Sequence, residues 1–159
     1  MEGKEIKLNL LCGEDVKVGW LNYDFFPCDN RVFYFNALEF PYPFLRKYAD
    51  KILISNGLEH FYKEMQIKIV NECYKILKDG GELILRLPTF LPYISHKTGF
   101  HHDNYLSGFV CKTPITKYLE QETFKEITVK GLRSRKWGWR FKKMLFSYFY
   151  DEYEYILKK

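Results

Sequence analysis

Two residues within the segment KLNLLCGEDVKVGWLNYD, Gly13 and Asp24, have the chemistry and the spacing to hold a nucleoside. A glycine turn after a short apolar strand lets backbone N–H groups approach a ligand, because no side chain stands in the way. A carboxylate at the end of the next strand can accept hydrogen bonds from both hydroxyl groups of a ribose. The order strand, glycine turn, strand, acid is therefore typical of a Rossmann-like sheet that binds a nucleoside.

LNLLCG and GWLNYD, which end at Gly13 and Asp24, form one motif that is similar to LNLGCG and GWxNxD of the class I S-adenosylmethionine-dependent methyltransferases, in particular their small type 11-like group. Three further segments resemble motifs of the same family. NALEFPYPF, from residue 36, is similar to DLxxFPYPF, and NGLEHF, from residue 56, is similar to HVLEHF. ECYKILKDGGELIL, from residue 72, is similar to ECYRVLKPGGRLRI. The resemblance spans residues 6–110, and the order of the four motifs makes it specific.

The resemblance implies that the chain binds S-adenosylmethionine and transfers its methyl group to an acceptor. Gly13 and Asp24 would grip the cofactor, Asn36 and Ala37 would lie at its adenine, and residues 55–58 would lie near its methionine end. The expected cofactor-binding residues are Leu11, Cys12, Gly13, Asp24, Asn36, Ala37, Ser55, Asn56, Gly57 and Leu58.

Leu11 is the main departure from the family's pattern, because it stands where the family has the first glycine of the loop. A side chain there would crowd the methionine portion of the cofactor or force a different turn. Asn56 and Gly57 also replace the first two residues of HVLEHF, and Asn36 replaces an aspartate. These departures keep open a second hypothesis, a catalytically inactive member of the fold. An NAD-linked oxidoreductase is disfavoured, because the chain has no GxGxxG opening a long helix.

Hydrophobic periodicity predicts the same α/β fold without the family. Apolar residues recur every three or four positions over residues 65–78, which predicts a helix with one buried face. Gly80 and Gly81 should end this helix. Short apolar strands that alternate with helices predict a mostly parallel, Rossmann-like sheet. Residues 124–130 and 153–157 are expected to add an antiparallel C-terminal strand pair.

The length of 159 residues predicts a single methyltransferase-like domain that is small for this fold. Residues 1–110 would form its cofactor-binding core, and residues 111–159 would add the C-terminal strands and a basic substrate-side addition, with helices at residues 116–122 and 140–150. The gap between Gly13 and Trp20 is too short for a crossover helix of several turns. We therefore expect a shortened first crossover.

Two neighbouring histidines, His101 and His102, are the candidate catalytic residues. The family often carries histidines in the loop after the fifth strand, and an imidazole can accept a proton from a hydroxyl or amine acceptor near neutral pH. The alternative is that they make structural hydrogen bonds. No metal site is expected, because the four cysteines are scattered and form no CxxC pair.

Positive charge is concentrated in the C-terminal part of the chain. Residues 112–159 hold twelve basic residues against six acidic ones, and residues 130–143 hold seven basic residues and no acid. This segment, KGLRSRKWGWRFKK, mixes basic and tryptophan side chains, as is typical of proteins that bind phosphates and stack bases. Its candidate substrate-side patch consists of Arg133, Arg135, Lys136 and Arg140. Nucleic-acid binding is thus a third hypothesis, and a solvated helix face, a membrane surface or a protein partner are the alternatives.

The composition predicts a cytoplasmic protein. No run of residues approaches the length of a membrane span, and the charged N-terminus MEGKEIK does not resemble a signal peptide. The chain is rich in Lys, Phe, Tyr, Ile and Asn and has two alanines, a usage that suggests an A/T-rich genome, viral genomes included. For a viral protein the expected location is the host cytoplasm. The many aromatic residues are compatible with a homodimer.

Overall fold

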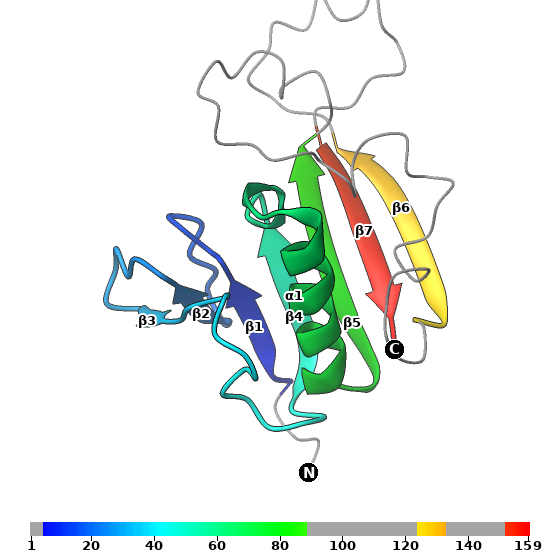
Figure 1. The fold of residues 1–159 in the computed structure, drawn as a ribbon, viewed down its shortest axis with the longest axis horizontal. Helices are drawn as coiled ribbons and strands as arrows, with labels where there is room; N and C mark the ends of the chain where they lie inside the picture. The colour runs from blue at the N-terminus through cyan, green and yellow to red at the C-terminus, as the bar shows by residue number, and fades with distance from the viewer. Residues whose placement is uncertain (1–4, 89–123, 133–151) are drawn as a thin grey trace, which may run out of the picture.

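The structure, a computed structural model, describes residues 5–88, 124–132 and 152–159. These residues form a seven-stranded sheet with one α-helix against it (Figure 1). The strand order is β3-β2-β1-β4-β5-β7-β6. The elements are β1 (Lys7–Leu10), β2 (Leu21–Asp24), β3 (Val32–Tyr34), β4 (Ala49–Ser55), the 3₁₀ turn η1 (Leu58–His60), α1 (Lys63–Ile76), β5 (Leu77–Pro88), β6 (Glu126–Leu132) and β7 (Glu152–Lys158).

Strand direction confirms the expected fold class. Strands β3, β2, β1, β4 and β5 are parallel to one another. Strand β7 is antiparallel to both β5 and β6. Strands β6 and β7 correspond to the C-terminal pair predicted at residues 124–130 and 153–157. The helices expected at residues 116–122 and 140–150 lie outside the described residues, and the single-domain organisation stays a prediction.

Helix α1 begins and ends slightly earlier than the periodicity predicts. Leu77 leaves the helical conformation, with φ −64° and ψ 137°, and pairs with Ala49 as the first residue of β5. Gly80, with φ +79°, lies within β5, and its N–H donates to the carbonyl of Lys159. The prediction that the glycines end the helix is therefore wrong. Strand pairing and the complete burial of Leu77 end the helix first.

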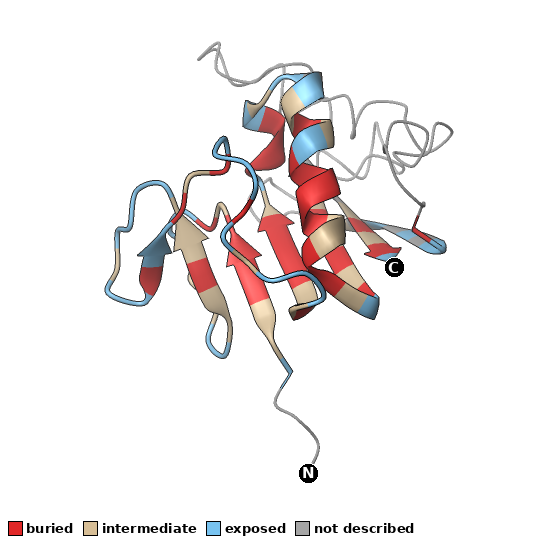
Figure 2. Cartoon of the chain, turned by 60° about the horizontal axis from the view of Figure 1, so that its bottom comes forward, coloured by how far each residue is buried: buried red, intermediate tan, exposed pale blue. Residues whose placement is uncertain are grey.

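The core lies between the sheet and α1, and Figure 2 shows in red the buried residues along the strands and the helix. The strands contribute residues at alternate positions, as a half-buried sheet requires. The helix contributes residues spaced by three and four, so one face of α1 is buried. The central residues of this core are Leu8, Leu10, Ile52, Ile54, Leu83 and Leu85 from the sheet, and Ile69, Val70, Cys73 and Ile76 from α1.

The first crossover, between β1 and β2, contains turns and no helix, which confirms that it is shortened. Two buried asparagines hold it. The side-chain amide of Asn9 donates to Asn22 Oδ1 (2.9 Å) and to the Asp15 carbonyl (2.8 Å). Asn22 Oδ1 also accepts the Lys17 N–H (2.9 Å), and its amide donates to the carbonyls of Lys17 and Trp20 (3.1 Å each). The two side chains thus satisfy backbone groups that have no helix to pair with.

The opposite face of β4 and β5 is charged. Side chains alternate along a strand, so the residues between the core positions point away from α1. Lys51 Nζ lies 3.3 Å from a carboxylate oxygen of Glu5 and 3.6 Å from one of Glu82, and Arg86 Nε donates to Glu154 at 2.8 Å. This face is stabilised by cross-strand ion pairs.

Among the described helices, none has the length and apolar character to cross a membrane.

We expect Asn22→Ala to lower the free energy of unfolding by about 1–3 kcal/mol, because it leaves the Lys17 N–H and the buried Asn9 amide without their acceptor. Urea denaturation measures this difference. Asn30→Ala, at an exposed position, is the matched control. Equal stability of the two variants would contradict the role given to the asparagine pair.

Candidate functional site

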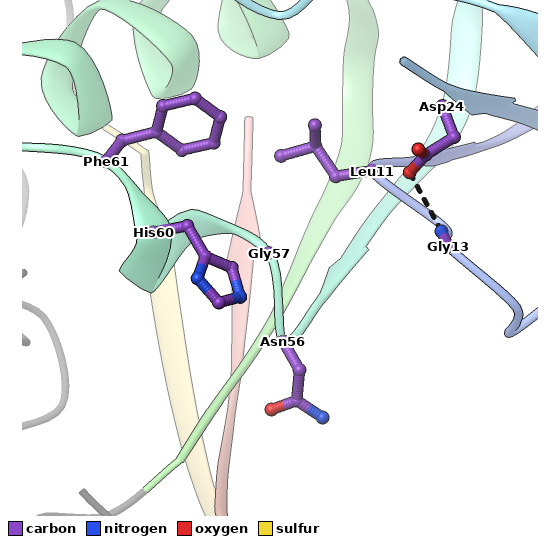
Figure 3. A pocket seen from close by; sticks show the side chains of 7 residues that line it. All are labelled: Leu11, Gly13, Asp24, Asn56, Gly57, His60 and Phe61. Atoms are coloured by element: carbon purple, nitrogen blue, oxygen red, sulfur yellow. Dashed lines mark hydrogen bonds between the residues drawn. The ribbon is translucent and has the colours of Figure 1, made fainter. Parts of the chain in front are cut away.

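A cavity of about 240 Å³ opens at the carboxyl ends of β1, β2 and β4. The turn after β1 contributes two of its residues, the end of β2 contributes one, and the segment after β4 contributes four. Open parallel sheets bind their ligands at this edge. The residues that line the cavity are Leu11, Gly13, Asp24, Asn56, Gly57, His60 and Phe61 (Figure 3).

Asp24 is held in place by two backbone N–H groups. Its Oδ2 accepts the N–H of Gly13 at 2.8 Å, and its Oδ1 accepts the N–H of Phe26 at 3.0 Å (Figure 3). A carboxylate offers about four lone-pair positions, so each oxygen can accept a further hydrogen bond. Asp24 is therefore a fixed, partly used acceptor that can bind the hydroxyl groups of a ligand in the cavity.

The backbone around the cavity is strained. Leu11 has φ +55° and Asn56 has φ +50°, in the left-handed region that side chains disfavour. Within the described parts of the chain, Lys47 is the other non-glycine residue in that region. Strained residues of this kind persist where the surrounding structure holds them, and they cluster at functional sites.

The side chain of Leu11 packs on the backbone of Gly57. A Cβ atom placed on Gly57 would lie 2.8 Å from the Cβ of Leu11 and 3.2 Å from its Cδ1, so no larger residue fits there unless the leucine moves. From this contact the isobutyl group points toward Phe61 (Figure 3). Leu11 and Phe61 thus give apolar side chains to a cavity that the carboxylate of Asp24 also lines.

Five of the predicted cofactor-binding residues line this cavity, namely Leu11, Gly13, Asp24, Asn56 and Gly57. The structure brings them together from three strand ends that are distant in the sequence. Leu58, by contrast, is fully buried in the core, and Ser55 is the last residue of β4 and not part of the lining. The cofactor contacts themselves stay a prediction.

Cys12 is turned away from the cavity. Its side chain is buried, and its N–H donates to the carbonyl of Tyr23. Burial is the main cause that raises the pKa of its thiol to about 11, and the charge of Asp24 adds to the effect. Cys12 is therefore a neutral thiol at physiological pH. Its buried side chain can stabilise the glycine turn by packing beneath it.

Asn36 and Ala37, expected at the adenine, lie outside the cavity lining. The Oδ1 of Asn36 accepts the N–H of Leu38 at 3.0 Å, and its amide donates to Glu39 at 2.9 Å. Ala37 is buried, and its carbonyl accepts the hydroxyl of Tyr42 at 3.0 Å. Both residues thus stabilise the turn after β3, and their role at a ligand stays a prediction.

His60 and Phe61 line the cavity although the sequence did not single them out as cofactor-binding residues. The sequence feature that could have identified them is their position in the segment NGLEHF, which directly follows an apolar strand. The candidate catalytic His101 and His102 lie outside the described residues. So does the basic patch of Arg133, Arg135, Lys136 and Arg140.

The orientation of Cys12 predicts a difference in thiol reactivity. With a pKa of about 11, roughly one Cys12 thiol in a thousand is ionised at about pH 8. The side chain of Cys28 is exposed. We expect iodoacetamide to alkylate Cys28 at least about tenfold faster than Cys12 in the folded protein, as followed by peptide mass spectrometry. Equal rates in the folded state would contradict the inward position of Cys12.

Comparison with known proteins identifies the fold. No protein-family model matches the sequence, and no curated protein matches it. Solved structures do match. An S-adenosylmethionine-dependent methyltransferase from Archaeoglobus fulgidus is 19% identical, with a TM-score of 0.64 over 99% of this chain and 87% of that chain. One from Thermotoga maritima is 16% identical, with a TM-score of 0.57 over 97% of this chain and 82% of that chain.

A third match, a protein from Bacillus halodurans assigned as a methyltransferase, is 17% identical, with a TM-score of 0.55 over 82% of this chain and 68% of that chain. At such low identity, these likenesses show the fold and no more. The chain has the fold of the class I S-adenosylmethionine-dependent methyltransferases, as its motifs predict.

Proposed function

We propose that this chain binds S-adenosylmethionine in the cavity at the ends of β1, β2 and β4, and that it transfers the methyl group to an acceptor. The observation that supports this most is the carboxylate of Asp24, which ends β2, lines the cavity and is fixed by the N–H of Gly13. A carboxylate at this point of the sheet is suited to bind a ribose.

The described residues fit the nucleoside part of this cofactor. Asp24 keeps lone pairs on both carboxylate oxygens for the ribose hydroxyls. Leu11 and Phe61 supply apolar side chains to the same cavity. Bound there, the cofactor would supply an activated methyl group on a positively charged sulfur, and that charge would be lost on transfer of the methyl group to the acceptor.

Two features of the chain would favour this reaction. Leu11 and Phe61 would exclude water and so favour the loss of charge, and Asp24 would fix the position of the ribose relative to the acceptor. An acceptor that carries a hydroxyl or amine also needs a base to take its proton. His101 or His102, which follow β5 in the sequence, is our proposal for that base.

The proposal predicts a specific loss of binding in Asp24→Ala. Hydrogen bonds to a charged group contribute about 1.5–3 kcal/mol, so the affinity for S-adenosylmethionine and S-adenosylhomocysteine should fall at least about tenfold. Isothermal titration measures both. Asp29→Asn is the matched control, because Asp29 pairs with Arg31 and lies outside the cavity lining. Unchanged affinity in Asp24→Ala would remove the ribose assignment.

We also propose nucleic acid as the partner of the basic segment, residues 130–143. Its seven basic residues, without an acid, are the observation in favour. A protein–phosphate interaction of this kind weakens steeply with salt. A homodimer and a cytoplasmic location stay predictions.

We expect salt-sensitive binding of single-stranded oligonucleotides that disappears when Arg133, Arg135 and Lys136 are replaced by alanine. The same binding should survive Asp24→Ala, since it is attributed to the basic segment and not to Asp24. Fluorescence anisotropy over a range of salt concentrations is the measurement. A variant with Arg46, Lys68 and Lys125 replaced by alanine loses the same charge at exposed positions elsewhere and serves as the control. Equal loss in both variants would mean that net charge, and not this segment, causes the binding.

A further inference from the structure

We infer that Leu11 and Gly57 form a complementary pair that determines how large a substituent the nucleoside in this cavity can carry. The inference rests on the proposed function, because it concerns the same cavity. It assigns Leu11 as the residue that discriminates between nucleosides with a short 5′ group and those with a long one.

The contact between the two residues is the first observation. The Cα of Gly57 lies so close to Leu11 that an added Cβ would approach the leucine Cβ to 2.8 Å and its carbonyl oxygen to 3.5 Å. At 2.8 Å two carbon atoms overlap, so Gly57 cannot carry a side chain while Leu11 stays in place. The leucine occupies the space that a side chain at position 57 would otherwise fill.

The second observation is that two of the departures from the quoted motifs, Leu11 and Gly57, meet at this contact. Leu11 stands where LNLGCG has a glycine, and Gly57 stands where HVLEHF has a valine. The side chain of Leu11, in the turn after β1, thus fills the space that a side chain at position 57 would otherwise occupy. Each change alone would leave a gap or an overlap, whereas the two together keep the wall of the cavity closed.

The backbone of Leu11 is the third observation. Its φ of +55° suits glycine far better than leucine, and the residue nevertheless lies there. Its side chain packs against the core while it lines the cavity. A strained residue that lines a cavity points to a role in that cavity.

The consequence for a ligand follows from the lining. Asp24 lines the same cavity as Leu11, Gly57 and Phe61 (Figure 3). If a ribose binds at Asp24, its 5′ substituent would have to share the same cavity with the apolar side chains of Leu11 and Phe61. The volume of about 240 Å³ lies below the roughly 300–1,000 Å³ of usual small-molecule sites. A short 5′-thioether fits against Leu11, whereas a long amino-acid chain must displace its side chain.

A double-mutant cycle on thermal stability tests the pair without any ligand. Gly57→Ala should lower the melting temperature by about 3–8 °C in the wild-type background, because its Cβ overlaps Leu11. The same change should have little effect in a Leu11→Gly background. Leu45→Gly, at an exposed leucine, is the control background in which the full loss should persist. An equal loss in all three backgrounds would overturn the pairing.

Ligand titration of the full chain tests the discrimination. The probes are 5′-deoxy-5′-methylthioadenosine, with a short group, and S-adenosylhomocysteine, with the long chain. Leu11→Gly should raise the affinity for S-adenosylhomocysteine relative to that for the short probe by at least about tenfold, which corresponds to about 1.4 kcal/mol. Leu45→Gly should leave the ratio as in the wild type. An unchanged ratio in Leu11→Gly would overturn the inference.

The two proposals fail in different ways. If both probes bind and Asp24→Ala weakens them, but Leu11→Gly leaves their ratio unchanged, the discrimination by Leu11 is wrong and the proposed function stands. If S-adenosylhomocysteine binds to Leu11→Gly and not to the wild type, Leu11 discriminates and the wild-type chain is not a methyltransferase. If neither probe binds to any variant, both proposals are overturned.

Discussion

The side-chain hydrogen bonds of Asn9 and Asn22, to each other and to the turn between β1 and β2, are the interaction on which the candidate site depends. The turn between β1 and β2 has no helix to satisfy its backbone groups, so the buried amides do this work. Because they join the two strands and the turn, they also set where the turn begins and where β2 ends. Gly13 and Asp24, at these two places, therefore come within hydrogen-bond distance.

The apolar lining of the cavity depends on Leu11, a residue with a strained backbone whose side chain packs on Gly57. Leu11 takes a left-handed backbone conformation, and its side chain fills the space beside Gly57. Cys12, the next residue, is buried below the same turn. The turn after β1 thus presents one side chain to the cavity and places the next one in the interior. This alternation lets a short segment close the cavity and support it.

The fold and the site give separate information about function. Similarity to solved methyltransferases extends over nearly the whole chain, yet at 19% identity or less in the three compared structures it shows architecture alone. One fold can host many activities, so the function has to be argued from the site. Here Asp24, its two backbone donors and the apolar side chains of the cavity favour a nucleoside ligand. Because Leu11 fills the space beside Gly57, the size of the ligand is the property that this cavity restricts most directly.

The sequence by itself determined the class of fold, the shortened first crossover and the meeting of Gly13, Asp24 and Asn56 at one edge of the sheet. It could do so because apolar periodicity and glycine turns are local, and because parallel strands bring their carboxyl ends together. Tertiary structure alone decided the rest. It ended α1 at Ile76, since Leu77 gains more from pairing with Ala49. It engaged the Asn36 side chain in its own turn and placed Leu11 on Gly57, since such contacts depend on how distant segments pack and leave no local pattern.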